Sequence, residues 1–150
     1  MPRLPGVDGK EKMSKSLGNA INLSDDAATV KKKVMKMYTD PTRIHVSDPG
    51  HLEGNVVFMY LDIFDTDKKG LEALKKQYKK GGVGDVVIKE RLVGILNDLF
   101  DPIRERRASY AKRKSEVMDI LEAGTANARK VALETLDRVH KAIGINYFKK

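Results

Sequence analysis

The apolar residues of the chain recur at intervals of three and four positions over most of its length, which is the spacing of one face of an α-helix. Val30, Val34 and Met37 form one such face. The predicted helices span residues 24–38, 55–64, 69–80, 85–100, 102–123 and 125–143. The pattern therefore predicts an all-α fold, a helical bundle, although the short apolar run at 55–64 also suits a buried strand.

Capping and breaking residues mark the limits of several predicted helices. Ser24 is suited to accept a hydrogen bond from the free N–H groups at the start of the first helix. Asp101-Pro102 has the form of an N-cap followed by proline at the first helical position, which predicts a sharp bend and a new helix. Gly124 and Gly144 are expected to end the last two helices.

The last two predicted helices each carry an apolar stripe that is expected to face the core. In the helix at 102–123 the stripe consists of Ile103, Tyr110, Val117, Ile120 and Leu121. In the last helix it consists of Ala128, Val131, Ala132, Leu136, Val139 and Ile143.

The first 23 residues lack this periodicity and are interrupted by glycine and proline, as is typical of a loop. An irregular terminal segment of this length usually belongs with another part of a protein. We therefore divide the chain into a loop segment, residues 1–23, and a helical domain, residues 24–150. A further loop is expected between residues 39 and 54, with a turn at Asp48-Pro49-Gly50.

Composition and charge narrow the classes of protein to consider. The 150 residues include 29 Lys and Arg against 21 Asp and Glu, a net charge of +8. Such an excess suggests an anionic partner: nucleic acid, a nucleotide or a membrane surface. Cysteine is absent, which excludes disulfides, thiol nucleophiles, iron–sulfur clusters and zinc sites built from cysteine. The three histidines are far apart in sequence and offer no His-x3-His ligand pair. The longest apolar run, residues 56–61, cannot span a bilayer, and we expect a soluble, cytoplasmic protein.

The N-terminal loop contains the most informative segment of the chain, Lys12-Met13-Ser14-Lys15-Ser16. Two ammonium groups and two hydroxyls on a glycine-flanked loop suit a polyphosphate, because lysine charges offset the negative charge that develops on a leaving pyrophosphate. The segment is not a Walker A loop, since the glycine spacing of that motif is absent. The alternative is a solvated basic loop without a ligand.

A basic run near residue 110 is a second candidate surface. Its members are Arg104, Arg106, Arg107, Lys112, Arg113 and Lys114. Such residues suit contacts with RNA phosphates, which give affinity with strong salt dependence and little sequence information. The alternative is an ordinary solvated face with ion pairs to Glu116 and Asp119. Two lysine clusters, at 31–36 and 75–80, are weaker candidates.

Residues 12–16 spell the KMSKS signature of the class I aminoacyl-tRNA synthetases without a mismatch, and we call them the KMSKS loop. The rest of the chain resembles the C-terminal portion of the tryptophanyl-tRNA synthetases. The strings that carry this likeness lie at residues 30–41, 48–50, 53–58, 102–107 and 124–129. The tyrosyl-tRNA synthetases share the fold and the loop type, but these strings fit them less well.

The resemblance implies a ligase that activates tryptophan with ATP and Mg²⁺ and transfers it to the tRNA for tryptophan. It implies catalytic roles for Lys12 and Lys15 in stabilising the β- and γ-phosphates. The loop residues implied to contact the ATP phosphates are Lys12, Met13, Ser14, Lys15 and Ser16. It also implies that the helical region binds tRNA and that the parent enzyme is a homodimer.

The Rossmann catalytic domain of that family, with its His-x-Gly-His motif, has no counterpart in this sequence. We therefore expect a fragment that begins just before the KMSKS loop, is inactive alone, and self-associates through exposed apolar faces. Residues 1–23 are then expected to be poorly ordered or to borrow a neighbouring surface. The alternatives are a noncatalytic helical RNA-binding module and the equivalent fragment of a tyrosyl-tRNA synthetase.

Overall fold

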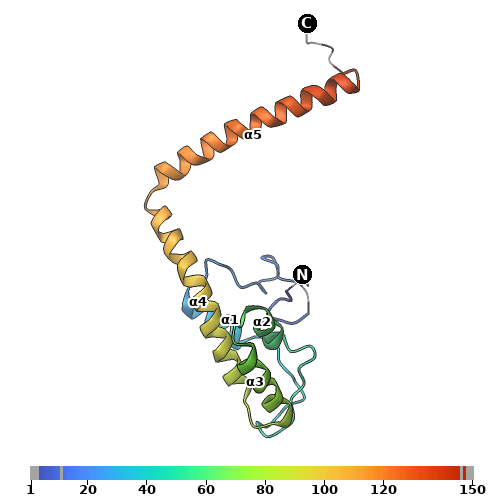
Figure 1. The fold of residues 1–150 in the computed structure, drawn as a ribbon, viewed down its shortest axis with the longest axis vertical. Coiled ribbons are helices and arrows are strands. Elements are labelled where there is room, and N and C mark those ends of the chain that lie inside the picture. Colours follow the sequence, from blue (N-terminus) through green and yellow to red (C-terminus); the bar gives the residue numbers. More distant parts are fainter. Residues whose placement is uncertain (1–3, 11, 146, 148–150) are drawn as a thin grey trace. The chain divides into compact units, whose positions relative to one another are not determined.

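The computed structural model describes residues 4–10, 12–145 and 147, and within them it has five α-helices and no β-strand (Figure 1). The helices are α1 (Ala27–Met35), α2 (Val56–Phe64), α3 (Lys68–Lys80), α4 (Asp85–Ala111) and α5 (Lys114–Ala142). The predicted all-α class is confirmed, and residues 55–64 contain a helix instead of the alternative strand. The chain divides into two compact units, Met1–Glu105 and Arg106–Lys150.

The first unit has one apolar core, to which α1, α2, α3 and the first part of α4 contribute. Helix α2 supplies the largest share, since five of its nine residues are buried. The other helices supply Val30, Val34, Leu71, Tyr78, Ile88, Leu92, Leu96 and Phe100. Burying one large apolar side chain contributes about 1.5–3 kcal/mol, so this cluster is the main source of stability in the first unit.

The N-cap of helix α1 lies two residues later than predicted, at Asp26, and the assignment of Ser24 as its cap is wrong. The carboxylate of Asp26 accepts a hydrogen bond from the N–H of Thr29 at 2.7 Å and caps the helix instead. Asp25 accepts the N–H of Asn22 at 2.9 Å, which turns the chain before the helix can start.

The predicted bend at Pro102 is wrong, because α4 runs through this residue without interruption. A proline inside a helix removes an N–H donor and costs about 3 kcal/mol or more. Arg104 offsets part of this cost by joining the turns on either side of the proline. Its guanidinium donates to Asn97 at 2.9 Å and to Asp101 at 2.6 Å.

In the second unit the helical break lies between α4 and α5, and the prediction that Gly124 ends a helix is wrong. Helix α5 continues through Gly124, because glycine inside a helix costs only about 1 kcal/mol. The prediction that Gly144 ends the last helix is confirmed, since its φ is +73°. The N–H of Ile145 then reaches back to the carbonyl of His140 at 3.1 Å, as in a Schellman motif.

Most of the apolar stripe predicted to be buried after residue 105 is exposed. Helix α5 contains no buried residue, and Tyr110 and Leu121 are 46% and 56% exposed. The described residues of Arg106–Lys150 form no second layer on which this stripe could pack, so this part of the predicted core is wrong. Ile103, in the first unit, does pack against the core.

The segment before α1 lies on the helices of the first unit. Leu4 and Val7 pack against the core, and the hydroxyl of Tyr60 on α2 donates to the carbonyl of Pro5 at 2.7 Å. Burial raises the pKa of Tyr60 to about 12, so this hydroxyl keeps its proton. Residues 1–3 and 11 lie outside the described part. Within the described part, Leu4, Val7 and Ile21 pack on the helical core, as expected of a segment that borrows a surface, while residues 15–18 are exposed.

Candidate phosphate loop and RNA-facing residues

The KMSKS loop projects from a segment whose two sides are joined by backbone pairing. Pro5 and Lys12 form an isolated antiparallel bridge. The N–H of Val7 donates to the carbonyl of Asn19 at 2.9 Å, and the N–H of Tyr38, just after α1, donates to the carbonyl of Val7 at 3.0 Å. The base of the loop is therefore attached to the helical part of the first unit.

Asn19 fixes the interior of this segment with its side chain and is only 4% exposed. Its Oδ1 accepts the N–H of Ser14 at 2.8 Å, and its Nδ2 donates to both carboxylate oxygens of Asp8 at 3.2 Å. Glycine is needed at position 6, because a Cβ on Gly6 would lie 2.3 Å from Nδ2 of Asn19. Asn19 thus connects the KMSKS loop to the arm that precedes it.

The charged side chains of the KMSKS loop face solvent. Lys12 and Lys15 are exposed, and neither forms an ion pair with a residue that the structure describes. The hydroxyl oxygens of Ser14 and Ser16 lie 2.8 Å apart, while Met13 is half-buried. Both ammonium groups and both hydroxyls are therefore placed where an anionic ligand can reach them.

A hollow of about 310 Å³ lies beside the KMSKS loop. It is lined by Ser14, Lys15, Gly18, Ala20, Asn22, Ser24 and Lys33. Lys33 of α1 donates to the carbonyl of Ala20 at 2.8 Å and to the carboxylate of Asp25 at 2.6 Å. Sequence reasoning placed Lys33 in a weak RNA-binding cluster, and the structure places it beside the KMSKS loop with its ammonium engaged by Asp25. The ammonium of Lys15 and the hydroxyls of Ser14 and Ser24, which also line the hollow, suit a phosphate.

Replacing Asn19 by alanine is expected to loosen the KMSKS loop while the core of the first unit stays intact. Ser14 and Asp8 lose their shared partner, and leaving buried polar groups unpaired costs about 1–3 kcal/mol. Trypsin cleavage after Lys12 and Lys15, followed by mass spectrometry, should then accelerate severalfold. Asn22→Ala, which removes a neighbouring amide, serves as the control. An unchanged cleavage rate after Lys15 in Asn19→Ala would contradict this role.

Two of the six predicted RNA-facing cations form side-chain contacts with other residues of the chain. In the first unit, Arg104 also donates to the backbone carbonyl of Asp25 at 2.9 Å. In the second unit, Arg113 forms an ion pair with Glu116 at 2.7 Å and lies 4.8 Å from the ring centroid of Tyr110. For Arg113 the structure shows the ion pair that the alternative interpretation expected.

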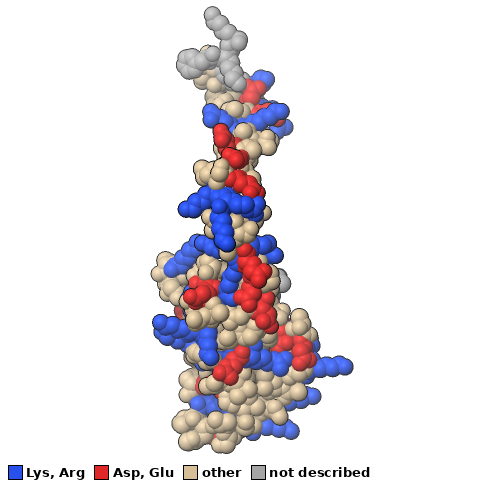
Figure 2. Space-filling view, turned by 90° about the vertical axis from the view of Figure 1, so that its left-hand side faces the viewer, with Lys and Arg blue, Asp and Glu red and all other residues tan. Residues whose placement is uncertain are grey.

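The remaining four cations, Arg106, Arg107, Lys112 and Lys114, are exposed. None of them forms an ion pair with any residue in the described part of the chain. On the face drawn in Figure 2, basic and acidic side chains are interspersed, and no broad area has a single sign. The candidate RNA-facing surface is therefore the short stretch from residue 106 to residue 114.

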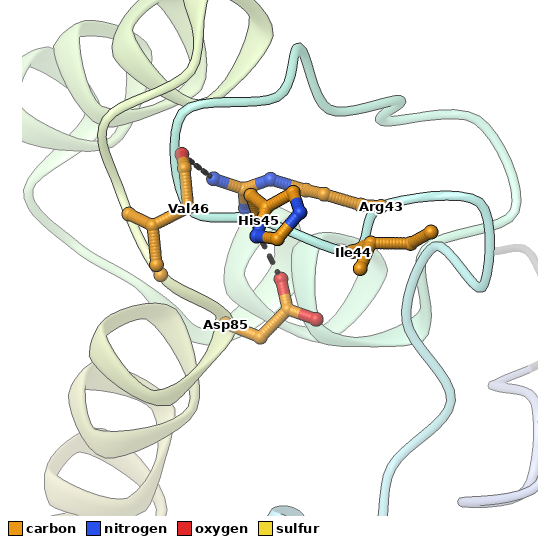
Figure 3. Close-up of a pocket in the computed structure, with 6 residues that line it drawn as sticks. Arg43, Ile44, His45, Val46 and Asp85 are labelled. Carbon is orange, nitrogen blue, oxygen red and sulfur yellow. Dashed lines mark hydrogen bonds and ion pairs between the residues drawn. The ribbon is translucent and has the colours of Figure 1, made fainter.

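A polar cluster that sequence reasoning missed joins the loop before α2 to the start of α4 (Figure 3). The side chain of Arg43 is only 4% exposed, and it donates to Asp85 at 3.3 Å and to the carbonyl of Val46 at 2.6 Å. Its guanidinium lies 4.4 Å from the ring centroid of Tyr78. A hollow of about 160 Å³ lies beside it. Because Arg43 makes all of these contacts within the first unit, we assign it a structural role. Sequence reasoning missed it because Arg43 belongs to no periodic pattern or motif.

Among the residues that the structure describes, no group of three or more His, Asp or Glu side chains is arranged to hold a metal ion. No helix in that same part of the chain is long and apolar enough to cross a membrane.

Comparison with known proteins gives consistent matches. The family described as tRNA synthetases class I (W and Y) matches residues 1–101. The tryptophan–tRNA ligases of Streptococcus pyogenes serotype M3 and Streptococcus mutans serotype c are each 57% identical over 148 residues, or 97% of this chain. The structure of tryptophanyl-tRNA synthetase from Campylobacter jejuni, complexed with ADP and tryptophan, aligns with 96% of this chain at a TM-score of 0.78 and 31% identity.

The matched region includes the KMSKS loop and continues beyond the family match into the second unit. This chain spans 44% of the length of both streptococcal ligases and 44% of the Campylobacter chain. The chain therefore belongs to the class I tRNA synthetases of the tryptophan and tyrosine type, and it is homologous to part of tryptophan–tRNA ligase.

Proposed function

We propose that this chain is the C-terminal portion of a tryptophan–tRNA ligase, which activates tryptophan with ATP and transfers it to its tRNA. The observation that supports this most directly is the 57% identity to such ligases over 148 residues. The KMSKS loop, with two exposed lysines beside a polar hollow, agrees with this proposal.

In the proposed activation step, a carboxylate oxygen of tryptophan attacks the α-phosphorus of ATP, and the bond to the β-phosphate oxygen breaks. Pyrophosphate leaves with the electron pair of that bond. Lys12 and Lys15 are the catalytic residues, because their charges stabilise the oxygens on which negative charge develops. Ser14 and Ser16 donate hydrogen bonds to the same phosphates, and Met13 packs the loop. ATP enters this step with Mg²⁺ bound to its phosphates.

The chain alone is not expected to activate tryptophan. Contacts to phosphate provide only part of the binding and orientation that the transition state requires. The relatives are more than twice as long as the matched region. We assign the other contacts to ATP and tryptophan, and the homodimer interface, to the segment of the relatives that lies outside the match. The exposed cations at 106–114 would bind the backbone of tRNA, and the enzyme would act in the cytoplasm.

The proposal is tested with a hybrid ligase, in which this chain replaces the 148 matched residues of the Streptococcus pyogenes protein. The hybrid should catalyse tryptophan-dependent exchange of pyrophosphate into ATP, and the isolated chain should not. A folded hybrid without exchange activity, beside an active parent, would contradict the assignment. Exchange by the isolated chain would contradict the need for the additional part.

A second candidate function is a noncatalytic RNA-binding module. The observation that favours it is the group of four exposed cations at 106–114, which form no ion pair with a described residue. A preference for tRNA with the tryptophan anticodon over an anticodon-swapped copy, retained at higher salt, would support a module that reads the anticodon by itself. Equal and steeply salt-dependent binding to both would show that the charge supplies only nonspecific affinity.

A further inference from the structure

A third hollow, of about 440 Å³, lies where α4 ends and α5 begins, and the proposed activation of tryptophan makes no use of it. Its lining consists of Arg107, Tyr110, Ala111, Lys114, Val117 and Met118. All of these residues belong to the second unit, Arg106–Lys150. The volume is within the range of about 300–1,000 Å³ that is usual for small-ligand sites. The hollow therefore combines an apolar floor with two cations.

Tyr110 gives this hollow an aromatic surface that is already oriented. The guanidinium of Arg113 lies 4.8 Å from its ring centroid. Arg113 is held in turn by Glu116 at 2.7 Å and by the hydroxyl of Ser109 at 3.3 Å. The tyrosine remains 46% exposed, so a flat ligand can reach it. Stacking on a ring that is held in place loses little conformational entropy.

The charged residues that line the hollow are all basic. Arg107 and Lys114 line it, Arg106 and Lys112 are close to them in sequence, and no acidic residue lines it. None of these four cations has an ion-pair partner within the described residues. An occupant that suits this site must cover an apolar floor and bring negative charge to the rim. An apolar protein segment meets only the first requirement, and inorganic phosphate meets only the second.

We propose that this hollow binds an unpaired nucleotide of RNA, with its base against Tyr110 and Met118 and its phosphates on Arg107 and Lys114. Unpaired bases stack on aromatic rings and arginine planes, and lysine and arginine bind the adjoining phosphates. Bases inside a paired stem are stacked on each other and cannot cover the apolar floor. The inference rests on the proposed binding of RNA by the helical region. It goes further by naming the residues that bind one unpaired base.

The test uses the full chain and an RNA hairpin that carries 2-aminopurine in its loop, because the fluorescence of this base is quenched when it stacks. A duplex with the sequence of the same stem is titrated in parallel and followed by fluorescence anisotropy. The variants are Tyr110→Ala, Tyr110→Phe and Lys114→Ala. Tyr147→Ala is the matched control, since Tyr147 is 78% exposed and lies outside the hollow. Circular dichroism verifies that each variant keeps its helices.

The wild-type chain should bind the hairpin more tightly than the duplex and quench the probe. Tyr110→Ala should weaken hairpin binding about 5- to 150-fold, the usual loss for one stacked base, and should abolish the quench. Tyr110→Phe and Tyr147→Ala should bind as the wild type does. Lys114→Ala should weaken binding to both RNAs and lower the slope of log affinity against log salt by about 0.7–0.9.

If Tyr110→Ala binds the hairpin as tightly as the wild-type chain does, the nucleotide site is overturned. The broader proposal that the helical region binds RNA still stands in that case, provided that Lys114→Ala binds both RNAs more weakly. If the wild-type chain binds neither RNA, both proposals are overturned. If Tyr110→Ala instead converts a dimer to a monomer in sedimentation, with hairpin binding unchanged, the hollow holds a second copy of the chain and the nucleotide site is overturned.

Discussion

Replacing Tyr78 by alanine is expected to lower the free energy of unfolding of the first unit by about 3–5 kcal/mol. Tyr78 lies on α3 and is fully buried. Its ring meets that of Phe58 edge-on, with a centroid distance of 5.0 Å. Its hydroxyl donates to Asp85 at 2.8 Å and accepts from Asn55 at 3.3 Å. Alanine leaves a cavity and also removes the partner of two polar side chains.

The measurement is urea unfolding followed by near-ultraviolet circular dichroism, which reports the packing of the tyrosines. Tyr78→Phe is the matched control, since it keeps the ring and removes only the hydroxyl, and we expect it to cost about 1–3 kcal/mol. Burial raises the pKa of Tyr78 to about 12, so the hydroxyl is a hydrogen-bond donor at all ordinary pH values. If Tyr78→Ala and Tyr78→Phe cost the same, the ring would contribute nothing and the packing argument would fail.

In the hybrid ligase, Lys15→Ala is expected to lower the rate of tryptophan-dependent ATP–pyrophosphate exchange by about 10²–10³-fold, the usual effect of one preorganised group facing developing charge. The ammonium of Lys15 is exposed on the KMSKS loop and lines the adjacent hollow. The variant loses transition-state stabilisation, so the maximal rate should fall more than the affinity for tryptophan.

Lys10→Ala is the control for this experiment, because Lys10 is also an exposed lysine of the N-terminal segment but lies outside the KMSKS loop. It should leave the exchange rate close to that of the unsubstituted hybrid. An equal effect of both substitutions would show that the overall charge of the segment matters and that Lys15 has no specific role. An unchanged rate in Lys15→Ala would contradict the assigned catalytic role.

Much of the first unit could be predicted because short apolar repeats stand between clear helix breakers. Val30 and Val34 lie one helical turn apart, and both are buried. Gly81 follows the last residue of α3 with a φ of +86°, a conformation that favours glycine. Local spacing and local breakers determine such helices, so the sequence carries the signal for them.

The same reasoning failed where contacts or their absence decide the outcome. Pro102 is a breaker by its own chemistry, but Arg104 joins the turns on both sides of it. The stripe on α5 has the period of a buried helix face, but no residue that the structure describes in the second unit covers it. Periodicity shows which face of a helix is apolar, and it does not show whether another element packs there.

By itself, the sequence determined the all-α class, the KMSKS loop and the synthetase family, because each depends on residues that are neighbours along the chain. The tertiary structure alone decided that Asn19 ties Ser14 to Asp8, that Arg104 is engaged within the first unit, and that Tyr110 borders a basic hollow. These features depend on side-chain contacts and on the space left between helices. Neither the side-chain contacts nor the space between helices produces a periodic pattern or a contiguous motif in the sequence.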